Sequence, residues 1–268
     1  MKDLASRPTG WGGPIVEPPT IAAVEAAAER IGEVVVHTPL IPFHGGKDAT
    51  GILLKPEIFQ PIGSFKLRGV FNWAAALTPA ERQRGLSTIS SGNTAQALGY
   101  SAQHFGVPAR TLLLDTAPAG KIAALQGYGV DTVLVPSDDL MGYLLEARWQ
   151  QEPYSFINPI DNPWMIAGNA TIGREIMADY PEVESVYVPV SGGGMIAGIG
   201  GLIKALNPSV RIVGVQPTNI APLHASIAES RPLWVDAQPT ICDGCGAPLV
   251  FDEMYPVLRQ VVVEVMVI

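Results

Sequence analysis

Short runs of apolar residues, rich in Val, Ile and Leu, alternate with amphipathic stretches along most of the chain. The runs at 109–115, 185–190 and 211–217 are apolar almost throughout, which is typical of parallel strands that are covered by helices on both faces. Stretches between such runs carry their apolar residues at helical spacing, as in 138–151. This alternation predicts an α/β fold built on parallel sheets.

Capping and breaking residues set the expected boundaries of the elements. Gly32, Gly106 and Gly129 follow three of the expected helices, and Asp138 or Asp139 is available as the N-cap of another. Helices are predicted at 20–31, 94–105, 121–128, 138–151, 169–180 and 195–206. Strands or extended segments are predicted at 34–40, 51–57, 88–91, 109–115, 131–136, 185–190, 211–217 and 261–268.

Composition and charge narrow the class of protein. The chain has 268 residues, of which 47% are hydrophobic and 16% charged, and its mean hydropathy is +0.24. These values favour a large packed core and exclude a disordered or collagen-like chain. The 17 basic and 25 acidic residues give a net charge of −8, so no excess of positive charge favours nucleic acid or an anionic membrane as a partner. Residues 1–20 lack the apolar run of a secretory signal, and we expect a cytoplasmic protein.

Cys242 and Cys245 form a Cys-x-x-Cys pair, and they are the 2 cysteines of the chain. A structural zinc site needs about four ligands, and no His lies near these cysteines in the sequence. A redox motif of this type usually begins a helix after a strand, whereas Asp243, Gly244 and Gly246 predict a loop. We therefore interpret the pair as two reduced cysteines in a loop and predict no metal site.

A glycine-rich segment, Ser191-Gly192-Gly193-Gly194-Met195, follows an expected strand and begins an expected helix. Glycines at such a turn let backbone N–H groups approach an anion, and the positive end of the helix dipole adds to the attraction. The segment therefore indicates a phosphate site. It lacks the G-x-G-x-x-G spacing of dinucleotide-binding folds and the Lys of a P-loop. The alternative is a turn whose glycines serve the backbone alone.

A second polar segment, Ser90-Ser91-Gly92-Asn93-Thr94, also lies between an expected strand and an expected helix. Its hydroxyl and amide groups, together with the unpaired N–H groups of a helix start, suit a carboxylate ligand. Ser and Asn are common helix caps, so capping is the alternative interpretation.

Lys66 lies in the segment GSFKLRG at 63–69, between Phe65 and Leu67. Apolar neighbours disfavour the charged form of a lysine and make its amine nucleophilic, which is the form that Schiff-base chemistry requires. The alternative is a solvated surface lysine.

Together and in this order, these motifs resemble those of the pyridoxal-phosphate enzymes of the tryptophan synthase β-like fold (fold type II), and within it the serine/threonine dehydratase and serine racemase group. The likeness extends over about residues 20–263. The segments that carry it are 55–60, 63–69, 90–98, 167–176, 188–200, 214–217 and 243–244. The resemblance implies two doubly wound parallel-sheet domains with the cofactor between them. The larger domain would comprise 1–78 and 162–268, and the smaller one 79–161.

The resemblance also implies a role for each motif residue. Lys66 would form a Schiff base with pyridoxal 5'-phosphate, and Phe65 would pack beside the cofactor ring. Asn93 would bind the ring hydroxyl, and Gly244 would border the ring. The phosphate would be held by Ser191, Gly192, Gly193, Gly194 and Met195. The substrate carboxylate would be received by Ser90, Ser91 and Thr94, with Ser91 on the face opposite Lys66.

The implied activity is that of an ammonia-lyase (dehydratase), which converts a β-hydroxy amino acid such as L-threonine or L-serine into a 2-oxo acid and ammonia. The freed Lys66 amine would remove the Cα proton. Reprotonation by Ser91 from the other face would make the same site a serine racemase, and a hydroxyaspartate or phenylserine dehydratase is a further alternative. The family likeness implies a homodimer.

Some residues depart from the pattern of the family. Thr94 stands where many relatives have His, which leaves the preferred substrate open. Cation-binding relatives have an acidic residue at the position of Gln216 and another near the position of Pro222. Neither Gln nor Pro carries the negative charge that a hard cation prefers, so no activating metal is expected there. Arg68 belongs to the general motif and is interpreted as a structural ion-pair partner.

The chain ends with the apolar run VVVEVMVI at 261–268, whereas the family continues for several more elements. One of those elements carries the group that faces the pyridine nitrogen, and no residue here can be assigned that role. The large domain is therefore expected to be C-terminally incomplete. A catalytically inactive, truncated relative that acts as a binding module is the contrasting hypothesis.

Overall fold

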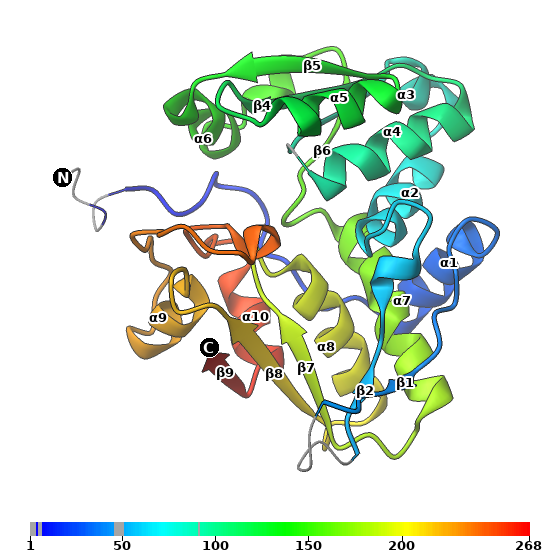
Figure 1. Ribbon diagram of the computed structural model, residues 1–268, viewed down its shortest axis with the longest axis vertical. Coiled ribbons are helices and arrows are strands. Elements are labelled where there is room, and N and C mark those ends of the chain that lie inside the picture. The colour runs from blue at the N-terminus through cyan, green and yellow to red at the C-terminus, as the bar shows by residue number, and fades with distance from the viewer. Residues whose placement is uncertain (1–3, 5–6, 46–50, 91) are drawn as a thin grey trace.

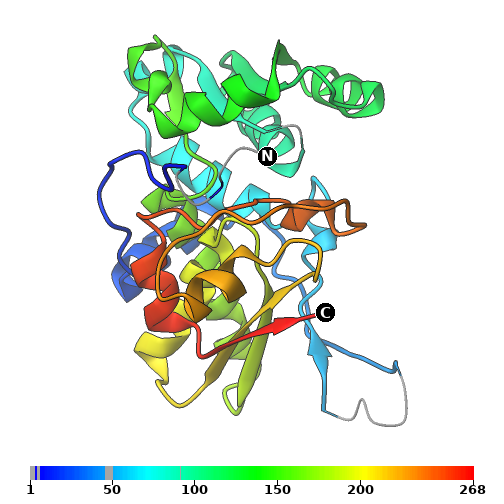
Figure 2. The ribbon, with the colours of Figure 1, turned by 90° about the vertical axis from the view of Figure 1, so that its left-hand side faces the viewer.

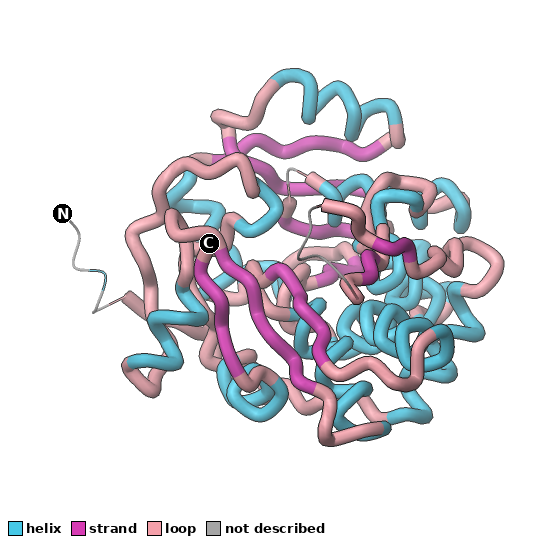
Figure 3. The backbone as a smooth tube through the Cα atoms, turned by 60° about the horizontal axis from the view of Figure 1, so that its bottom comes forward, coloured by secondary structure: helices cyan, strands magenta, loops and turns pink. Residues whose placement is uncertain are grey.

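The computed structural model describes residue 4 and residues 7–45, 51–90 and 92–268. These residues form two parallel sheets and one short antiparallel pair of strands (Figure 1; Figure 3). One sheet has the strand order β5-β4-β3-β6 and the other the order β7-β8-β9. Every pairing within these two sheets is parallel, and helices pack against the strands. The predicted α/β fold with parallel sheets is confirmed.

Most of the predicted elements have a counterpart within a few residues. The strands are β1 (Ile41–Pro42), β2 (Leu53–Leu54), β3 (Leu86–Ile89), β4 (Ala109–Leu114), β5 (Val130–Val135), β6 (Ser155–Ile157), β7 (Ser185–Pro189), β8 (Arg211–Gln216) and β9 (Glu264–Val267). The α-helices are α1 (Ile21–Ile31), α2 (Lys66–Ala76), α3 (Pro79–Gln83), α4 (Asn93–Phe105), α5 (Ala119–Gly127), α6 (Ser137–Leu145), α7 (Pro163–Asp179), α8 (Gly194–Leu206), α9 (Pro222–Ala228) and α10 (Tyr255–Val261). Short 3₁₀ turns are η2 (Glu57–Phe59), η3 (Arg148–Gln151) and η4 (Asp243–Cys245). Among the described residues, no helix combines the length and the apolar character that a membrane span needs.

Helix α7 begins at Pro163, earlier than the predicted start at residue 169. The side chain of Asn162 accepts hydrogen bonds from the backbone N–H groups of Trp164 and Met165, at 3.0 and 3.1 Å. Pro163 occupies the first helical position, where its missing N–H costs nothing. The sequence prediction did not recognise Asn162 and Pro163 as the start of this helix.

Helix α7 is buried over most of its length, and α1, α2 and α8 pack against it. Its contact with α2 is a close approach of two backbones. A Cβ atom at Gly168 would lie 2.4 Å from the carbonyl oxygen of Arg68, and one at Gly69 would lie 2.5 Å from the Cγ atom of Met165. Both positions need glycine, and their contact sets the position of the first turn of α2, which begins at Lys66.

The helix predicted at 138–151 is wrong in its second half. Helix α6 ends at Leu145, and Ala147 adopts a left-handed conformation with φ of 51° before the η3 turn. This break directs Trp149 onto Phe156, with ring centroids 5.0 Å apart in a stacked arrangement. The N-cap position is Pro136, with no side-chain capping bond, so the prediction of an Asp cap at 138 or 139 is also wrong.

Two further boundaries differ from the prediction. Residues 34–40 contain no strand; β1 follows them and pairs with β2 inside the predicted segment 51–57. The apolar run 261–268 is divided, because Val261 ends α10 and only Glu264–Val267 forms a strand, which pairs in parallel with β8. Apolar character alone does not separate the end of a buried helix from an edge strand.

The N-terminal segment (residues 9–16) runs between the part of the molecule that holds the four-stranded sheet and the part that holds β7, β8 and β9 (Figure 1; Figure 2). The ring of Trp11 packs edge-on against Trp149 with centroids 5.2 Å apart, and its indole N–H donates to Asp161 at 2.6 Å. The backbone N–H groups of Trp11 and of the two glycines that follow donate to one oxygen of Glu253, at 2.9, 2.9 and 3.2 Å. The segment therefore joins both parts.

Candidate functional site

The lysine singled out from the sequence is the first residue of α2. Ser64 Oγ accepts a hydrogen bond from the backbone N–H of Lys66 at 3.3 Å, and Gly63 adopts a left-handed φ of 70° in the turn before the helix. The Lys66 side chain is half-buried, with Nζ 5.1 Å from the centroid of the Phe65 ring. Burial lowers the pKa of Lys66 to about 8. A larger share of this amine is therefore uncharged at neutral pH than in a solvated lysine.

Lys66 faces a pocket of about 320 Å³, a volume at the lower end of the range for small-ligand sites. The walls come from segments that follow strands of both sheets: Ser90 after β3, Ile160 after β6 and Ser191 after β7. Ligands of α/β proteins bind outside the carboxyl ends of parallel strands. The pocket lies where the carboxyl ends of the two sheets meet.

The glycine-rich segment forms one side of this pocket. All of its residues, from Ser191 to Met195, line the pocket, and Gly193 has a left-handed φ of 94°. A Cβ atom at Gly194 would lie 2.7 Å from the carbonyl oxygen of Ile160, so only glycine allows this close packing. No side chain caps the start of α8, and its first N–H groups are left for an anion.

The hydroxyl of Ser191 adds a further donor at this place. Its Oγ atom accepts a hydrogen bond from the backbone N–H of Ala247 at 3.1 Å, which leaves the hydroxyl proton for another acceptor. Gly244 and Cys245 form the neighbouring wall of the pocket. The segment 242–247 therefore lies against the glycine-rich segment.

The structure brings together only part of the predicted substrate-binding group. Ser90 lines the pocket. Asn93, the first residue of α4, is exposed, and Thr94 is buried; neither is among the described residues that line the pocket. Ser91 lies outside the described residues. Lys66, Phe65, Ser90, the glycine-rich segment and Gly244 thus share one pocket.

A buried ion-pair network fixes the start of α2, and sequence reasoning identified only one of its members. Arg68 is 1% exposed and donates to Glu57 at 2.7 and 2.8 Å and to Glu175 at 2.6 and 3.0 Å. Lys55 Nζ lies 2.6 Å from Glu175. Burial alone would lower the pKa of Arg68, but the hydrogen bonds and charges of the two glutamates raise it. The structural ion-pair role that was expected of Arg68 is confirmed.

Other pocket residues carried no signal in the sequence analysis. Ile89, Pro159 and Ile160 form apolar walls, and Cys245 was interpreted only as a loop cysteine. The two cysteines are free and lie at the η4 turn, as predicted for a loop.

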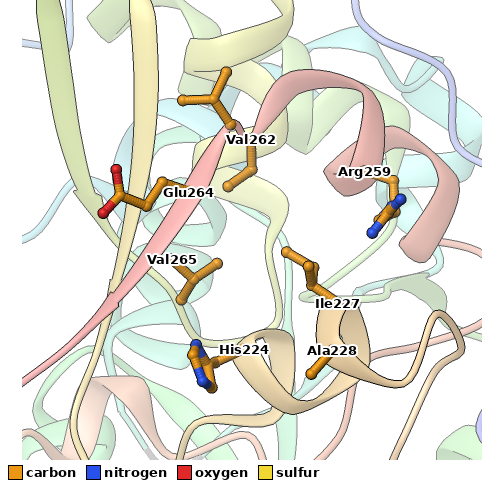
Figure 4. A pocket seen from close by; sticks show the side chains of 8 residues that line it. His224, Ile227, Ala228, Arg259, Val262, Glu264 and Val265 are labelled. Carbon is orange, nitrogen blue, oxygen red and sulfur yellow. The ribbon is translucent and has the colours of Figure 1, made fainter.

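A second pocket, of about 390 Å³, lies between α9, α10 and β9 (Figure 4). His224, Arg259 and Glu264 contribute polar groups, and the valines around β9 contribute apolar ones. Its described lining includes none of the motif residues from the sequence analysis. The candidate functional site is therefore the pocket that contains Lys66.

Among the residues that the structure describes, no cluster of three or more His, Cys, Asp or Glu side chains is placed to hold a metal ion. The amide of Gln216 is buried and used internally. Its oxygen accepts the backbone N–H of His224 at 3.0 Å, and its nitrogen donates to the carbonyl oxygen of Val190 at 3.4 Å. Gln216 therefore serves to hold α9 beside β8.

Comparison with known proteins gives consistent matches. Residues 31–268 match the family described as "Pyridoxal-phosphate dependent enzyme". The chain is 36% identical to the L-threonine ammonia-lyase of Thermotoga maritima over 252 residues, which cover 93% of this chain and 63% of that protein. It is 36% identical to the catabolic L-threonine dehydratase of Escherichia coli over 219 residues, which cover 81% of this chain and 66% of that protein. The chain spans just under two thirds of the length of these two relatives.

A solved structure gives the same picture for the fold. The structure of maize serine racemase matches with a TM-score of 0.87 and 31% identity, covering 94% of this chain and 77% of that chain. The maize enzyme therefore shares the parallel-sheet architecture of this chain. Its name gives the activity of a serine racemase, which differs from the activities in the names of the two sequence relatives.

The residues of the pocket fit pyridoxal phosphate. The uncapped start of α8 and the Ser191 hydroxyl supply donors for a phosphate, and the amine of Lys66 faces the same pocket. The apolar side chains of Phe65 and Ile160 line the same pocket. A phosphate-bearing aromatic aldehyde has the corresponding groups: an anion, a ring and a carbon that a lysine amine attacks.

Proposed function

Since the chain belongs to the pyridoxal-phosphate dependent enzyme family, we propose that it is an ammonia-lyase that converts a β-hydroxy amino acid, such as L-threonine or L-serine, into a 2-oxo acid and ammonia. The observation that carries the proposal is the placement of a half-buried amine, Lys66, in the pocket that also contains an uncapped glycine-rich helix start. The names of the two relatives above, a threonine ammonia-lyase and a threonine dehydratase, support this choice of substrate.

In this proposal the chain itself holds the cofactor by its two ends. The phosphate is bound by Ser191 and the backbone of Gly192, Gly193, Gly194 and Met195, and the aldehyde carbon is bound by Lys66 Nζ. Phe65 packs beside the ring, and Gly244 leaves room at its edge because a glycine has no side chain there. Pyridoxal phosphate, when bound, draws electrons from the Cα atom of the amino acid and so acidifies its Cα–H bond.

Lys66 acts in the proposal as the group that moves the Cα proton, after the substrate amine has replaced the Lys66 amine at the aldehyde carbon. An amine can accept that proton only in its uncharged form, and burial already favours this form by lowering the pKa to about 8. The network around Arg68 acts as a positioning device, since it holds the first turn of α2 and thereby the backbone of Lys66. Loss of the β-hydroxyl as water and hydrolysis of the resulting enamine complete the reaction.

The substrate carboxylate is proposed to bind at the junction of β3 and α4. Ser90 lies on the pocket wall, and we assign the same role to Ser91 and Thr94. Asn93 is proposed to bind the ring hydroxyl. Because Asn93 is exposed and Thr94 does not line the pocket in this structure, the proposal requires the start of α4 to move toward Lys66 when substrate binds. The proposed smaller domain, residues 79–161, would carry this movement.

Serine racemase activity is the second candidate, supported by the match with the maize enzyme. The two activities differ in their products. The test is to incubate the pyridoxal-phosphate-loaded chain with L-threonine and with L-serine, and to follow both 2-oxo acid and D-serine. We expect 2-oxo acid from both substrates and none from a Lys66→Ala variant; D-serine without 2-oxo acid would favour the racemase, and no product from a cofactor-loaded chain would favour the binding module.

A homodimer and a cytoplasmic location are also proposed. The net charge of −8 and the composition support the location. The β1–β2 pair projects from the molecule (Figure 2). The dimer is supported by the exposed large apolar side chains on this pair and on the nearby η2 turn, because exposed apolar surface marks interaction sites. These side chains include Phe43, Leu54, Ile58 and Phe59, with Ile58 70% and Phe59 60% exposed. Light scattering should show a dimer for the wild type and for Leu206→Gln, and a monomer for Phe59→Gln.

A further inference from the structure

The η4 turn places two cysteines at the edge of the pocket. Cys245 lines the pocket beside Gly244, whereas Cys242 is exposed. The backbone N–H of Cys245 donates to the carbonyl oxygen of Cys242 at 2.8 Å, which closes a four-residue turn. A turn of this kind holds the Cα atoms of its first and fourth residues within about 7 Å, which is close to the separation that a disulfide between them needs.

The chemical setting also indicates that the two thiols are close. Burial, the nearby Cys242 and the carboxylate of Asp243 each raise the pKa of Cys245. Cys245 is therefore kept as a protonated thiol in the pocket wall, while Cys242 is the cysteine that meets reagents from solution.

The turn is connected to both sides of the pocket. On one side, the backbone N–H of Ala247 donates to Ser191 Oγ at 3.1 Å, which joins the turn to the glycine-rich segment. On the other side, Asp243 forms an ion pair with Lys121 of α5 at 3.0 Å. A change in the shape of the turn is therefore transmitted to the proposed phosphate site and to the helix layer of the four-stranded sheet.

We propose that Cys242 and Cys245 form a reversible thiol–disulfide pair whose state alters the wall of the pocket. The disulfide itself is independent of the proposed function, and only its effect on cofactor binding rests on that function. The oxidant is a small-molecule disulfide of the glutathione type.

The exchange takes place in two steps. The Cys242 sulfur, as thiolate, attacks the small disulfide, forms a mixed disulfide and releases one small thiol. The Cys245 thiol then loses its proton and attacks the Cys242 sulfur, which forms the Cys242–Cys245 bond and releases the second small thiol. The two protein thiols lose two electrons and two protons in total, and the small disulfide gains them.

The new bond has a defined effect on the pocket. A disulfide requires Cβ atoms about 3.5–4.5 Å apart and a fixed dihedral angle, so the bond constrains both cysteines and the peptide between them, which includes Gly244. Gly244 and Cys245 form the wall of the pocket. We expect the oxidised chain to bind pyridoxal phosphate about fivefold more weakly, the effect of losing roughly one hydrogen-bonding contact.

The experiment treats the whole chain with oxidised glutathione and identifies the products by peptide mass. The expected product is a monomer in which the peptide that contains both cysteines has lost two hydrogens, and reduction should restore both thiols. Cys242→Ser and Cys245→Ser are the matched controls, and neither should give that product. A wild type that carries two separate glutathione adducts, or that becomes cross-linked between chains, would overturn the proposal.

Hydrogen exchange tests the effect on the pocket without the cofactor. Oxidation should change amide exchange in residues 191–195 as well as in 242–247 of the wild type, and in neither segment of Cys245→Ser. Unchanged exchange at 191–195 in a disulfide-containing chain would overturn the link to the pocket. Pyridoxal phosphate should also slow alkylation of Cys245 but not of Cys242. A reduced chain that fails to bind the cofactor at all would contradict the proposed function. In that case the hydrogen-exchange result still decides whether the disulfide alters the pocket wall.

Discussion

At the scale of single residues, the position of Lys66 explains its chemistry. The sequence predicted a desolvated amine from Phe65 and Leu67, and the structure places this amine in a pocket where burial lowers its pKa to about 8. Arg68 could be identified as an ion-pair partner, but its acceptors could not, since Glu175 lies more than a hundred residues away in the chain. Which residues meet in a buried network depends on how helices cross, and a single sequence does not specify this.

The lowered pKa of Lys66 predicts the pH dependence of its reactivity. The uncharged amine is the reactive form, so the acylation rate of Lys66 in the cofactor-free chain should rise about tenfold per pH unit and level off above about pH 8, whereas a free lysine derivative continues to rise to about pH 10.4. Mass spectrometry of the labelled peptide over a pH series measures this rate. A plateau that appears only near the value of free lysine would contradict the burial of the amine.

At the scale of elements, glycines and caps decided where prediction succeeded. Helices that end in a left-handed glycine, such as α4 at Gly106, were placed within one residue of their ends. The prediction failed where the deciding feature is a tertiary contact: the break at Ala147 serves the packing of Trp149 on Phe156. The parallel strands were predictable because their apolar runs are continuous. The close contact between α2 and α7 could not be predicted, although both of its glycines, Gly69 and Gly168, lie in segments that carry the family resemblance.

The contact between α2 and α7 should be sensitive to one methyl group. A Gly168→Ala change places Cβ 2.4 Å from the Arg68 carbonyl oxygen, so the helices must separate, and we expect the free energy of unfolding to fall by about 1–3 kcal/mol. Gly120→Ala in α5 is the matched control, since a Cβ atom there would meet nothing within 4 Å; it should leave the free energy of unfolding unchanged or raise it by up to about 1 kcal/mol. Urea unfolding measures both, and equal effects would contradict the close contact.

At the scale of the whole molecule, the candidate site depends on two sheets that meet at their carboxyl ends. The family resemblance implied that the motifs after 89 and after 190 converge, and Ser90 and the glycine-rich segment line one pocket. The role of the N-terminal segment could not be predicted, because Trp11 and the two glycines that follow it belong to no periodic pattern. Their partners, Asp161 and Glu253, are buried acids. Burial and the charge of Glu253 raise the pKa of Asp161, although the bond from Trp11 opposes this shift.

The N-terminal segment should stabilise the molecule through Glu253. A Glu253→Ala change leaves three backbone N–H groups without their acceptor, and we expect a loss of about 2–4 kcal/mol in the free energy of unfolding. Amide exchange at residues 11–13 should also become faster. Asp252→Ala is the matched control, because Asp252 is exposed and accepts a single side-chain hydrogen bond from Thr9. If Glu253→Ala lowers the free energy of unfolding no more than Asp252→Ala does, the contacts of the N-terminal segment with Glu253 do not stabilise the protein.

In the proposed function, Lys66 and the glycine-rich segment together form a pyridoxal-phosphate site. The most direct measurement is to load the chain with pyridoxal phosphate, reduce it with borohydride and locate the added mass by peptide mapping. We expect one modified residue, Lys66, and a marked loss of modification when Gly194→Ala crowds the loop against Ile160. Modification that is spread over other lysines, with Lys66 unmodified, would contradict the proposed cofactor site.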